Sequence, residues 1–167
     1  MPVENERKYV LDIAFDAGHL RGWTRHDVRQ GYLDDGPRIR QRDGDYIFTY
    51  KKWAPQAGEL VEIETAISED DFSLLWPLST QRIVKTRYVL LTGEVEWVVD
   101  FLRDENGQVY FVMAEAELPR GQAAPDHIPA EIAGGIIHAV DAADNRFTNK
   151  KLSNKGYAAD LYRLADA

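Results

Sequence analysis

Cysteine is absent from the 167-residue chain. This absence excludes disulfide bonds, zinc sites built on thiolates and a cysteine nucleophile. No apolar run approaches the roughly 18 residues that a membrane-spanning helix requires, and the N-terminal sequence MPVENERK is too charged for a secretory signal. The sequence therefore predicts a soluble, cytoplasmic protein without a membrane partner.

Several common catalytic signatures are also missing. The chain has no Walker A sequence and no Gly-x-Gly-x-x-Gly segment, and none of its few serines lies in a nucleophile elbow. Its four histidines show no metal-ligand spacing, so we expect them to be solvated or to cap helices; they are His19, His26, His127 and His138. Acidic residues outnumber basic ones by 28 to 20, and the net charge of −8 argues against a nucleic-acid partner.

Short segments of alternating apolar and polar residues dominate the chain as far as about residue 118. Tight turns such as Asp43-Gly44-Asp45 and Thr92-Gly93-Glu94 join them, and turns this short force antiparallel neighbours. The predicted strands are Glu4–Leu11, Val28–Leu33, Arg38–Arg42, Tyr46–Lys52, Leu60–Ile67, Arg82–Thr92, Val95–Leu102 and Val109–Leu118.

Helices are predicted at three places. Ser68 is a suitable N-cap for a helix that Pro77 would end. Residues 129–133 resemble a short helical turn stopped by two glycines, and the spacing of Leu161 and Leu164 predicts an amphipathic helix near the C-terminus. This order of elements predicts an α+β fold.

The predicted architecture is a closed eight-stranded antiparallel β-barrel with a charged lumen and helices packed outside. We expect a single domain over residues 1–167, in which residues 120–167 form a helical C-terminal part.

Long charged side chains of both signs recur on one face of seven of the eight predicted strands. The ordinary explanation is the solvated face of a sheet whose apolar face packs on helices. Two features favour a charged lumen instead. A solvated face would carry more Ser, Thr, Asn and Gln, and the apolar faces need more cover than one central helix and a tail supply. A charged lumen is costly unless water, ions or a complementary ligand fill it. The mixture of inward bases and acids suits a polyanion held together with divalent cations.

The segment Glu4-Asn5-Glu6-Arg7-Lys8 resembles the Glu-x-Glu-x-Lys signature of the CYTH superfamily, also called the triphosphate tunnel metalloenzymes. Class IV adenylyl cyclases and thiamine triphosphatases are its founding members. Further segments resemble this family in the same order, over about residues 3–155, and the likeness is to its short bacterial members. These segments are Arg38-Ile39-Arg40, Thr49-Tyr50-Lys51, Leu60-Val61-Glu62-Ile63-Glu64, Lys85-Thr86-Arg87-Tyr88, Trp97-Val98-Val99-Asp100, Ala114-Glu115-Ala116-Glu117-Leu118-Pro119 and Asn145–Leu152.

The resemblance implies a role for each charged residue of the lumen. Mg²⁺ or Mn²⁺ would be the cofactor, since hard cations prefer carboxylate and phosphate oxygens; the implied metal ligands are Glu4, Glu6, Glu115 and Glu117. Arginine forks and lysine charges would hold the phosphates; the implied substrate-binding residues are Lys8, Arg38, Arg40, Lys51, Lys85 and Arg87.

Four residues are predicted to act in catalysis: Glu62, Glu64, Asp100 and Lys85. The three acids would hold a second metal or orient the attacking water, or would pair with the arginines. Glu96 and Arg42 lie near strand ends and are expected to form a pair at the rim. Lys155 is the one candidate contact in the tail, although a solvated lysine at a helix end is the alternative.

The resemblance implies a divalent-metal-dependent triphosphatase that hydrolyses a phosphoanhydride of inorganic triphosphate or a related small-molecule triphosphate. Two alternatives stay open. One is a class IV adenylyl cyclase that makes cyclic AMP and pyrophosphate from ATP. The other is a non-catalytic module that binds polyphosphate or nucleotides. The sequence leaves the oligomeric state open.

Overall fold

The computed structural model describes residues 5–34 and 36–167. Nine strands are found there: β1 Glu6–Leu11, β2 Thr24–Tyr32, β3 Arg38–Arg42, β4 Asp45–Ala54, β5 Glu59–Ala66, β6 Gln81–Thr92, β7 Val95–Arg103, β8 Val109–Glu117 and β9 Ile136–Ala139. The α-helices are α1 Glu69–Leu75, α2 Ala130–Ala133, α3 Asn149–Leu152 and α4 Lys155–Ala165, and two 3₁₀ helices are η1 Ala17–Leu20 and η2 Trp76–Leu78. No helix of the described residues is both long enough and apolar enough to cross a membrane.

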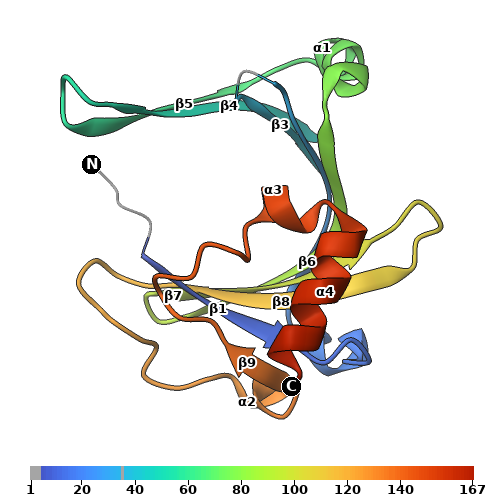
Figure 1. The fold of residues 1–167 in the computed structure, drawn as a ribbon, viewed down its shortest axis with the longest axis vertical. Coiled ribbons are helices and arrows are strands. Elements are labelled where there is room, and N and C mark those ends of the chain that lie inside the picture. The colour runs from blue at the N-terminus through green and yellow to red at the C-terminus, as the bar shows by residue number, and fades with distance from the viewer. Residues whose placement is uncertain (1–4, 35) are drawn as a thin grey trace.

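The nine strands form one antiparallel sheet in the order β5-β4-β3-β2-β6-β7-β8-β1-β9. The sheet is strongly curved, so that β3, β4 and β5 face β7, β8 and β1 across the curve (Figure 1). Among the described residues no ladder of hydrogen bonds joins β5 to the opposite end of the sheet. The antiparallel α+β prediction is confirmed, while closure into a barrel stays a prediction.

Most element predictions agree with the structure. Ser68 caps α1 by accepting a hydrogen bond from the backbone N–H of Asp71, as expected. The chain continues past Leu75 as the 3₁₀ helix η2, in which Pro77 can occupy an early position because its missing N–H is not needed there. The four-residue strand β9 was not predicted. It pairs with β1 and becomes one edge of the sheet.

The convex face of the sheet carries the first hydrophobic core. Trp97, Val99 and Phe101 of β7 alternate inward into it, and Leu20 of η1 and Ile132 of α2 cover it. Helix α1 lies on the same side, where Phe72 stacks on Trp76 and Arg29 lies over both rings. These elements pack outside, as predicted.

The concave face is apolar at one end and charged at the other. Phe111 and Met113 of β8 share this face with Glu115, two residues further along the strand. Helices α3 and α4 cover the apolar end with Leu152 and Leu161, which are buried against them. The prediction that the helices pack outside is therefore wrong for α3 and α4. Their apolar residues match the apolar end of the concave face, and α3 lies within the curve of the sheet (Figure 1).

Candidate functional site

Strand alternation brings the charged side chains of seven strands to a single cavity of about 330 Å³ on the concave face. Every residue that lines this cavity is polar or charged. The lining residues are Glu6, Lys8, Gln30, Arg38, Arg40, Arg42, Lys51, Glu62, Glu64, Lys85, Arg87, Glu96, Glu115, Glu117 and Asn149. The registers explain the grouping: Arg87 of β6 lies opposite Asp100 of β7, and Glu6 of β1 lies opposite Glu117 of β8.

The structure brings together all but two of the predicted site residues. Glu4 lies outside the described residues. Asp100 lies below the cavity floor, with none of its surface exposed, so it is placed to act through its neighbours rather than to touch a ligand. Of the choices left open for Asp100, pairing with a base is the one observed. The structure does not test the catalytic roles of the others.

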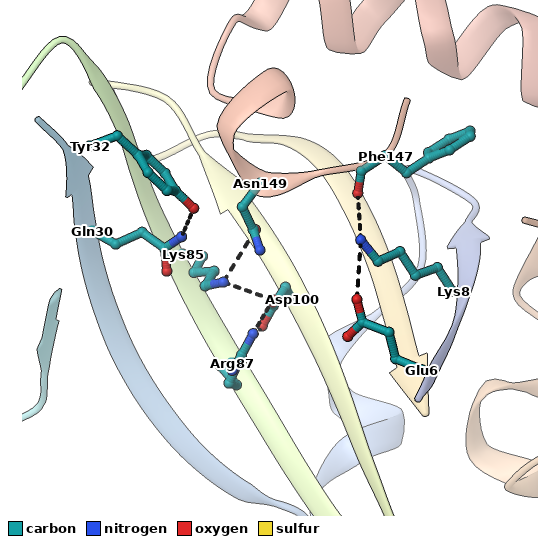
Figure 2. A network of polar contacts seen from close by, with 9 residues as sticks. All are labelled: Glu6, Lys8, Gln30, Tyr32, Lys85, Arg87, Asp100, Phe147 and Asn149. Carbon is teal, nitrogen blue, oxygen red and sulfur yellow. Dashed lines mark hydrogen bonds and ion pairs between the residues drawn. The ribbon is translucent and has the colours of Figure 1, made fainter. Parts of the chain in front are cut away.

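Lys85 and Arg87 form the floor of the cavity, and both contact Asp100 beneath it (Figure 2). Arg87 binds Asp100 with two hydrogen bonds, from Nε to Oδ1 and from Nη2 to Oδ2, each 2.7 Å long. Nζ of Lys85 lies 3.0 Å from Oδ2 of the same carboxylate. Burial favours the neutral acid, but the two cations outweigh it and hold the pKa of Asp100 well below its usual range.

Lys85 is the more weakly held cation of this cluster. It is almost fully buried, and burial together with the neighbouring Arg87 lowers its pKa to about 8. Burial acts on Arg87 in the same direction, but the bidentate pair with Asp100 raises the pKa of Arg87 above its ordinary value. Arg87 is therefore a fixed cation at neutral pH, while Lys85 can change its charge in mildly alkaline solution.

Two arginines of β3 form a cation wall beside this floor. The Nε atoms of Arg38 and Arg40 are buried and have no hydrogen-bond partner in the part of the chain that the structure describes. Burial and the nearby charges of Arg38 and Arg87 lower the pKa of Arg40 to about 10. A buried donor without a partner costs roughly 1–3 kcal/mol, so these unpaired donors lower the stability of the protein.

The opposite wall is acidic. Glu6 and Glu117 lie directly across from each other on β1 and β8, and Glu115 lies opposite Lys8. Burial, then the charges of Asp100 and Glu6, raise the pKa of Glu115 to about 7. Lys8 lies 3.6 Å from Glu6 and also lowers the pKa of Glu115, as Arg87 does, and an added cation would further relieve the repulsion between these carboxylates.

The donor chemistry of this wall fits a hard divalent cation, since carboxylate oxygens are the ligands that Mg²⁺ and Mn²⁺ prefer. Within residues 5–34 and 36–167, however, no group of three acidic or histidine side chains is close enough to hold a metal ion. The fourth predicted ligand, Glu4, lies outside that part. Glu6, Glu115 and Glu117 thus supply the right atoms, and metal binding remains a prediction.

The edge of the sheet contributes a third, more exposed wall. Lys51 of β4 lies 3.6 Å from Glu62 of β5, and the hydroxyl of Thr49 donates to Glu64 at 3.4 Å. Strand β5 is largely exposed along its length. Glu62 and Glu64 therefore line the cavity from its solvent-exposed side, and neither is buried like Asp100.

The C-terminal segment supplies contacts that sequence reasoning missed. Oδ1 of Asn149 accepts a hydrogen bond from Nζ of Lys85 at 3.3 Å, and the carbonyl of Phe147 accepts one from Lys8 at 3.1 Å (Figure 2). The family resemblance of residues 145–152 was the only signal for this region in the sequence. An uncharged side-chain amide and a backbone carbonyl add nothing to the charge alternation that identified the other site residues. Lys155 instead pairs with Glu105 on the surface, 2.6 Å away, in agreement with the alternative of a lysine outside the site.

The expected rim pair of Arg42 and Glu96 is replaced by a different contact. Both residues line the cavity, but Nη2 of Arg42 donates to Nε2 of His26 at 2.8 Å. The prediction failed because β2 begins at Thr24, four residues before the predicted start. The extra residues place His26 beside β3, on the concave face.

Comparisons with known proteins add little to this geometry. No family model and no curated protein matches the sequence. Twelve chains of solved structures match the fold, among them the crystal structure of a "putative adenylate cyclase" from Bacillus halodurans. That chain is 17% identical, with a TM-score of 0.48, over 72% of this chain and 82% of its own. A likeness this low carries no argument about the reaction.

Proposed function

We propose that this protein is a divalent-metal-dependent triphosphatase related to the triphosphate tunnel metalloenzymes. Its substrate would be inorganic triphosphate or a related small triphosphate, from which it hydrolyses a phosphoanhydride bond. The observation that carries this proposal is the cation wall: within the described part of the chain, the buried guanidinium Nε atoms of Arg38 and Arg40 have no protein partner, and the residues that line their cavity are all polar or charged. Phosphate oxygens are the acceptors that suit such donors best.

The proposal divides the work among the walls. Arg38, Arg40 and Arg87 would bind phosphate oxygens and neutralise charge that develops as the bond breaks, and Lys8, Lys51 and Lys85 would add point charges. Asp100 would keep Arg87 and Lys85 in place. Glu62 and Glu64 would orient the attacking water from the edge of the sheet. The closed barrel that the resemblance implies belongs to this proposal, with β5 brought against the opposite end of the sheet.

Mg²⁺ or Mn²⁺ would be held by Glu6, Glu115 and Glu117, together with Glu4. When bound, such an ion polarises phosphoryl oxygens and supplies an acidified water. The raised pKa of Glu115 supports this assignment, because a carboxylate that resists ionisation without a cation gains most from one. The proposal requires all four carboxylates to be charged when the ion is present.

Hydrolysis is favoured over cyclisation by the lining of the cavity. A cyclase has to hold the nucleoside of ATP, and bases are bound chiefly by stacking on aromatic or apolar groups. Of the residues that the structure describes, Gln30, Asn149 and thirteen charged side chains line the cavity, with no aromatic ring among them. Inorganic triphosphate needs no such surface.

A substrate panel tests the proposal. Inorganic triphosphate, ATP, thiamine triphosphate and longer polyphosphate would each be incubated with Mg²⁺, with Mn²⁺ and with EDTA, while phosphate and cyclic AMP are measured. We expect phosphate release from triphosphate that stops in EDTA and drops sharply in Arg40→Ala. Arg25→Ala, on the opposite face of β2, should keep full activity. Cyclic AMP from ATP would show a cyclase, and binding without turnover of any compound would show a non-catalytic module.

A further inference from the structure

His26, Arg42 and Asp43 form a linked set of side chains at the edge of the cavity. Nδ1 of His26 lies 2.7 Å from Oδ2 of Asp43, and its Nε2 lies 2.8 Å from Nη2 of Arg42. The His26 side chain is 16% exposed, and Arg42 lines the cavity itself. The proposed function gives no part to His26 or Asp43.

The chemistry of these contacts fixes the state of the imidazole. Arginine has donors only and stays charged in proteins, so Nε2 of His26 has to be the acceptor of the Arg42 contact. Nδ1 then carries the proton and donates to the Asp43 carboxylate. His26 is therefore neutral in this arrangement, in the Nδ1–H form. Protonation at Nε2 would remove the lone pair that accepts from Arg42.

Backbone contacts hold Asp43 in position to accept the hydrogen bond from His26. Its backbone adopts a φ of +53°, which a non-glycine residue rarely takes and which Asp tolerates better than most. Its other carboxylate oxygen accepts from the backbone N–H of Asp27 at 3.0 Å, and its own N–H donates to the Asp27 carbonyl at 2.9 Å. The hydrogen bond from His26 contributes most to the lowered pKa of Asp43. The unusual backbone conformation of this turn thus directs the Asp43 carboxylate toward His26.

The charges around His26 are cationic on the cavity side. Arg42 faces it from β3, and Arg87 lies directly opposite it on β6, on the same face of the sheet. Asp43, from the turn between β3 and β4, is the acidic group in contact with it. Neutral His26 can therefore sit between two arginines without adding to their repulsion, while it directs one of them.

We propose that His26 and Asp43 are positioning residues for Arg42, and that Arg42 is a further anion-binding residue of this cavity. Asp43 sets the tautomer of His26, and the free Nε2 lone pair of His26 holds the Arg42 guanidinium so that its remaining N–H groups face the bound polyanion. This inference rests on the proposed binding of a triphosphate. It assigns a role to a third arginine of β3, beyond Arg38 and Arg40.

A double-mutant cycle on triphosphate binding tests the energetic half of this inference. Calorimetry with inorganic triphosphate would compare the wild type with Arg42→Ala, His26→Ala and the double variant, and with His127→Ala as an exposed-loop control. We expect Arg42→Ala to weaken binding by about tenfold or more, as for one charge-assisted hydrogen bond. His26→Ala should weaken binding severalfold alone and not at all in the Arg42→Ala background. Independent, additive losses would overturn the positioning role.

Nitrogen NMR of the ligand-free protein tests the structural half. Wild-type His26 should show a protonated Nδ1 and an unprotonated Nε2 at neutral pH. Asp43→Asn should reverse this, because the Asp27 N–H holds the amide oxygen and leaves the amide NH₂ to face His26. That variant should then bind triphosphate as weakly as His26→Ala. The opposite tautomer in the wild type, or a reversed tautomer without a change in binding, would overturn the inference. A wild type that does not bind triphosphate would overturn the proposed function and this inference together, whereas additive losses overturn the inference alone.

Discussion

Arg87 and Asp100 form a bidentate ion pair across β6 and β7, with both N–O distances at 2.7 Å, and Asp100 has no exposed surface. Lys85, two residues before Arg87 on β6, completes the cluster. A buried ion pair of this kind contributes little net stability by itself, but breaking one side of it leaves an uncompensated charge. The cluster therefore fixes the direction of two cations at the floor of the cavity.

Replacing Asp100 tests this arrangement. Asp100→Asn keeps the size of the side chain but leaves two buried cations without their shared anion, so the free energy of unfolding should fall by about 3–5 kcal/mol. Asp27→Asn is a matched control, because the Asp27 side chain forms an exposed pair with Arg25 that contributes at most about 1 kcal/mol. Urea denaturation of both variants measures the difference. Equal stability of the two would contradict a structural role for Asp100.

The strands could be predicted because each alternates apolar and polar residues with period two, and this pattern is local. The grouping of Arg40, Lys85 and Glu115 on one face followed from the same alternation. How deeply each of these charged side chains is buried could not be predicted from the sequence. Asp100 and Glu96 occupy equivalent positions on β7, yet Asp100 is buried and Glu96 is exposed, because only Asp100 lies near the apolar end that α3 and α4 cover.

The placement of the C-terminal segment also lay beyond the sequence. Periodicity shows that α4 has an apolar side, but which face of a sheet it covers depends on how the sheet curves. The short strand β9 and the contact of Asn149 with Lys85 depend on the same tertiary arrangement. The His26 contact needed the true start of β2, which carries a polar run, Thr24 to Asp27, that conceals the strand.

Arg40 should have opposite effects on stability and on binding. Arg40→Met removes a buried donor that has no partner among the described residues, and it removes the repulsion from Arg38 and Arg87. The ligand-free protein should therefore gain about 1 kcal/mol in unfolding free energy. Triphosphate binding should weaken by about tenfold or more. Arg25→Met, on the other face, should change neither quantity. Thermal unfolding and calorimetry measure the two effects, and a variant that is less stable and binds normally would contradict the anion-binding wall.

Lys85 should make triphosphate binding sensitive to pH near its pKa of about 8. Below that pH the lysine is charged and attracts the anion, and above it the charge is lost, so the affinity advantage of the wild type over Lys85→Met should shrink between pH 7 and pH 9.5. Comparison with Lys85→Met cancels the protonation of triphosphate itself.

Rising pH should weaken the contribution of Lys85 to binding but should increase the stability of the folded protein. Between about pH 8 and its ordinary pKa of 10.5, the unfolded chain holds a proton at Lys85 that the folded protein has lost. The free energy of unfolding should therefore rise with pH in this window relative to Lys85→Met. Urea titrations of both proteins at pH 8 and pH 10 measure the difference. If the advantage of the wild type over Lys85→Met in triphosphate binding stays constant from pH 7 to pH 9.5, Lys85 does not titrate in that range.

Glu6 gives the sharpest test of the metal. Its carboxylate lies 3.6 Å from Nζ of Lys8 and is partly exposed, so as a simple ion pair it would contribute at most about 1 kcal/mol. As a metal ligand it would matter far more, since even residues that only support a ligand cost 10–100-fold when removed. We expect Glu6→Gln to keep its fold and to lose triphosphatase activity by about a hundredfold or more.

The loss in Glu6→Gln should be only partly recovered at high Mn²⁺, because the amide keeps the shape of the side chain but supplies a weaker, neutral oxygen. Glu105→Gln, at an exposed pair with Lys155, is the matched control and should behave as the wild type. Electron paramagnetic resonance would follow Mn²⁺ binding directly and without turnover. If Glu6→Gln binds Mn²⁺ and hydrolyses triphosphate as well as Glu105→Gln, or if the wild type is fully active in EDTA, the carboxylate wall does not hold a catalytic metal.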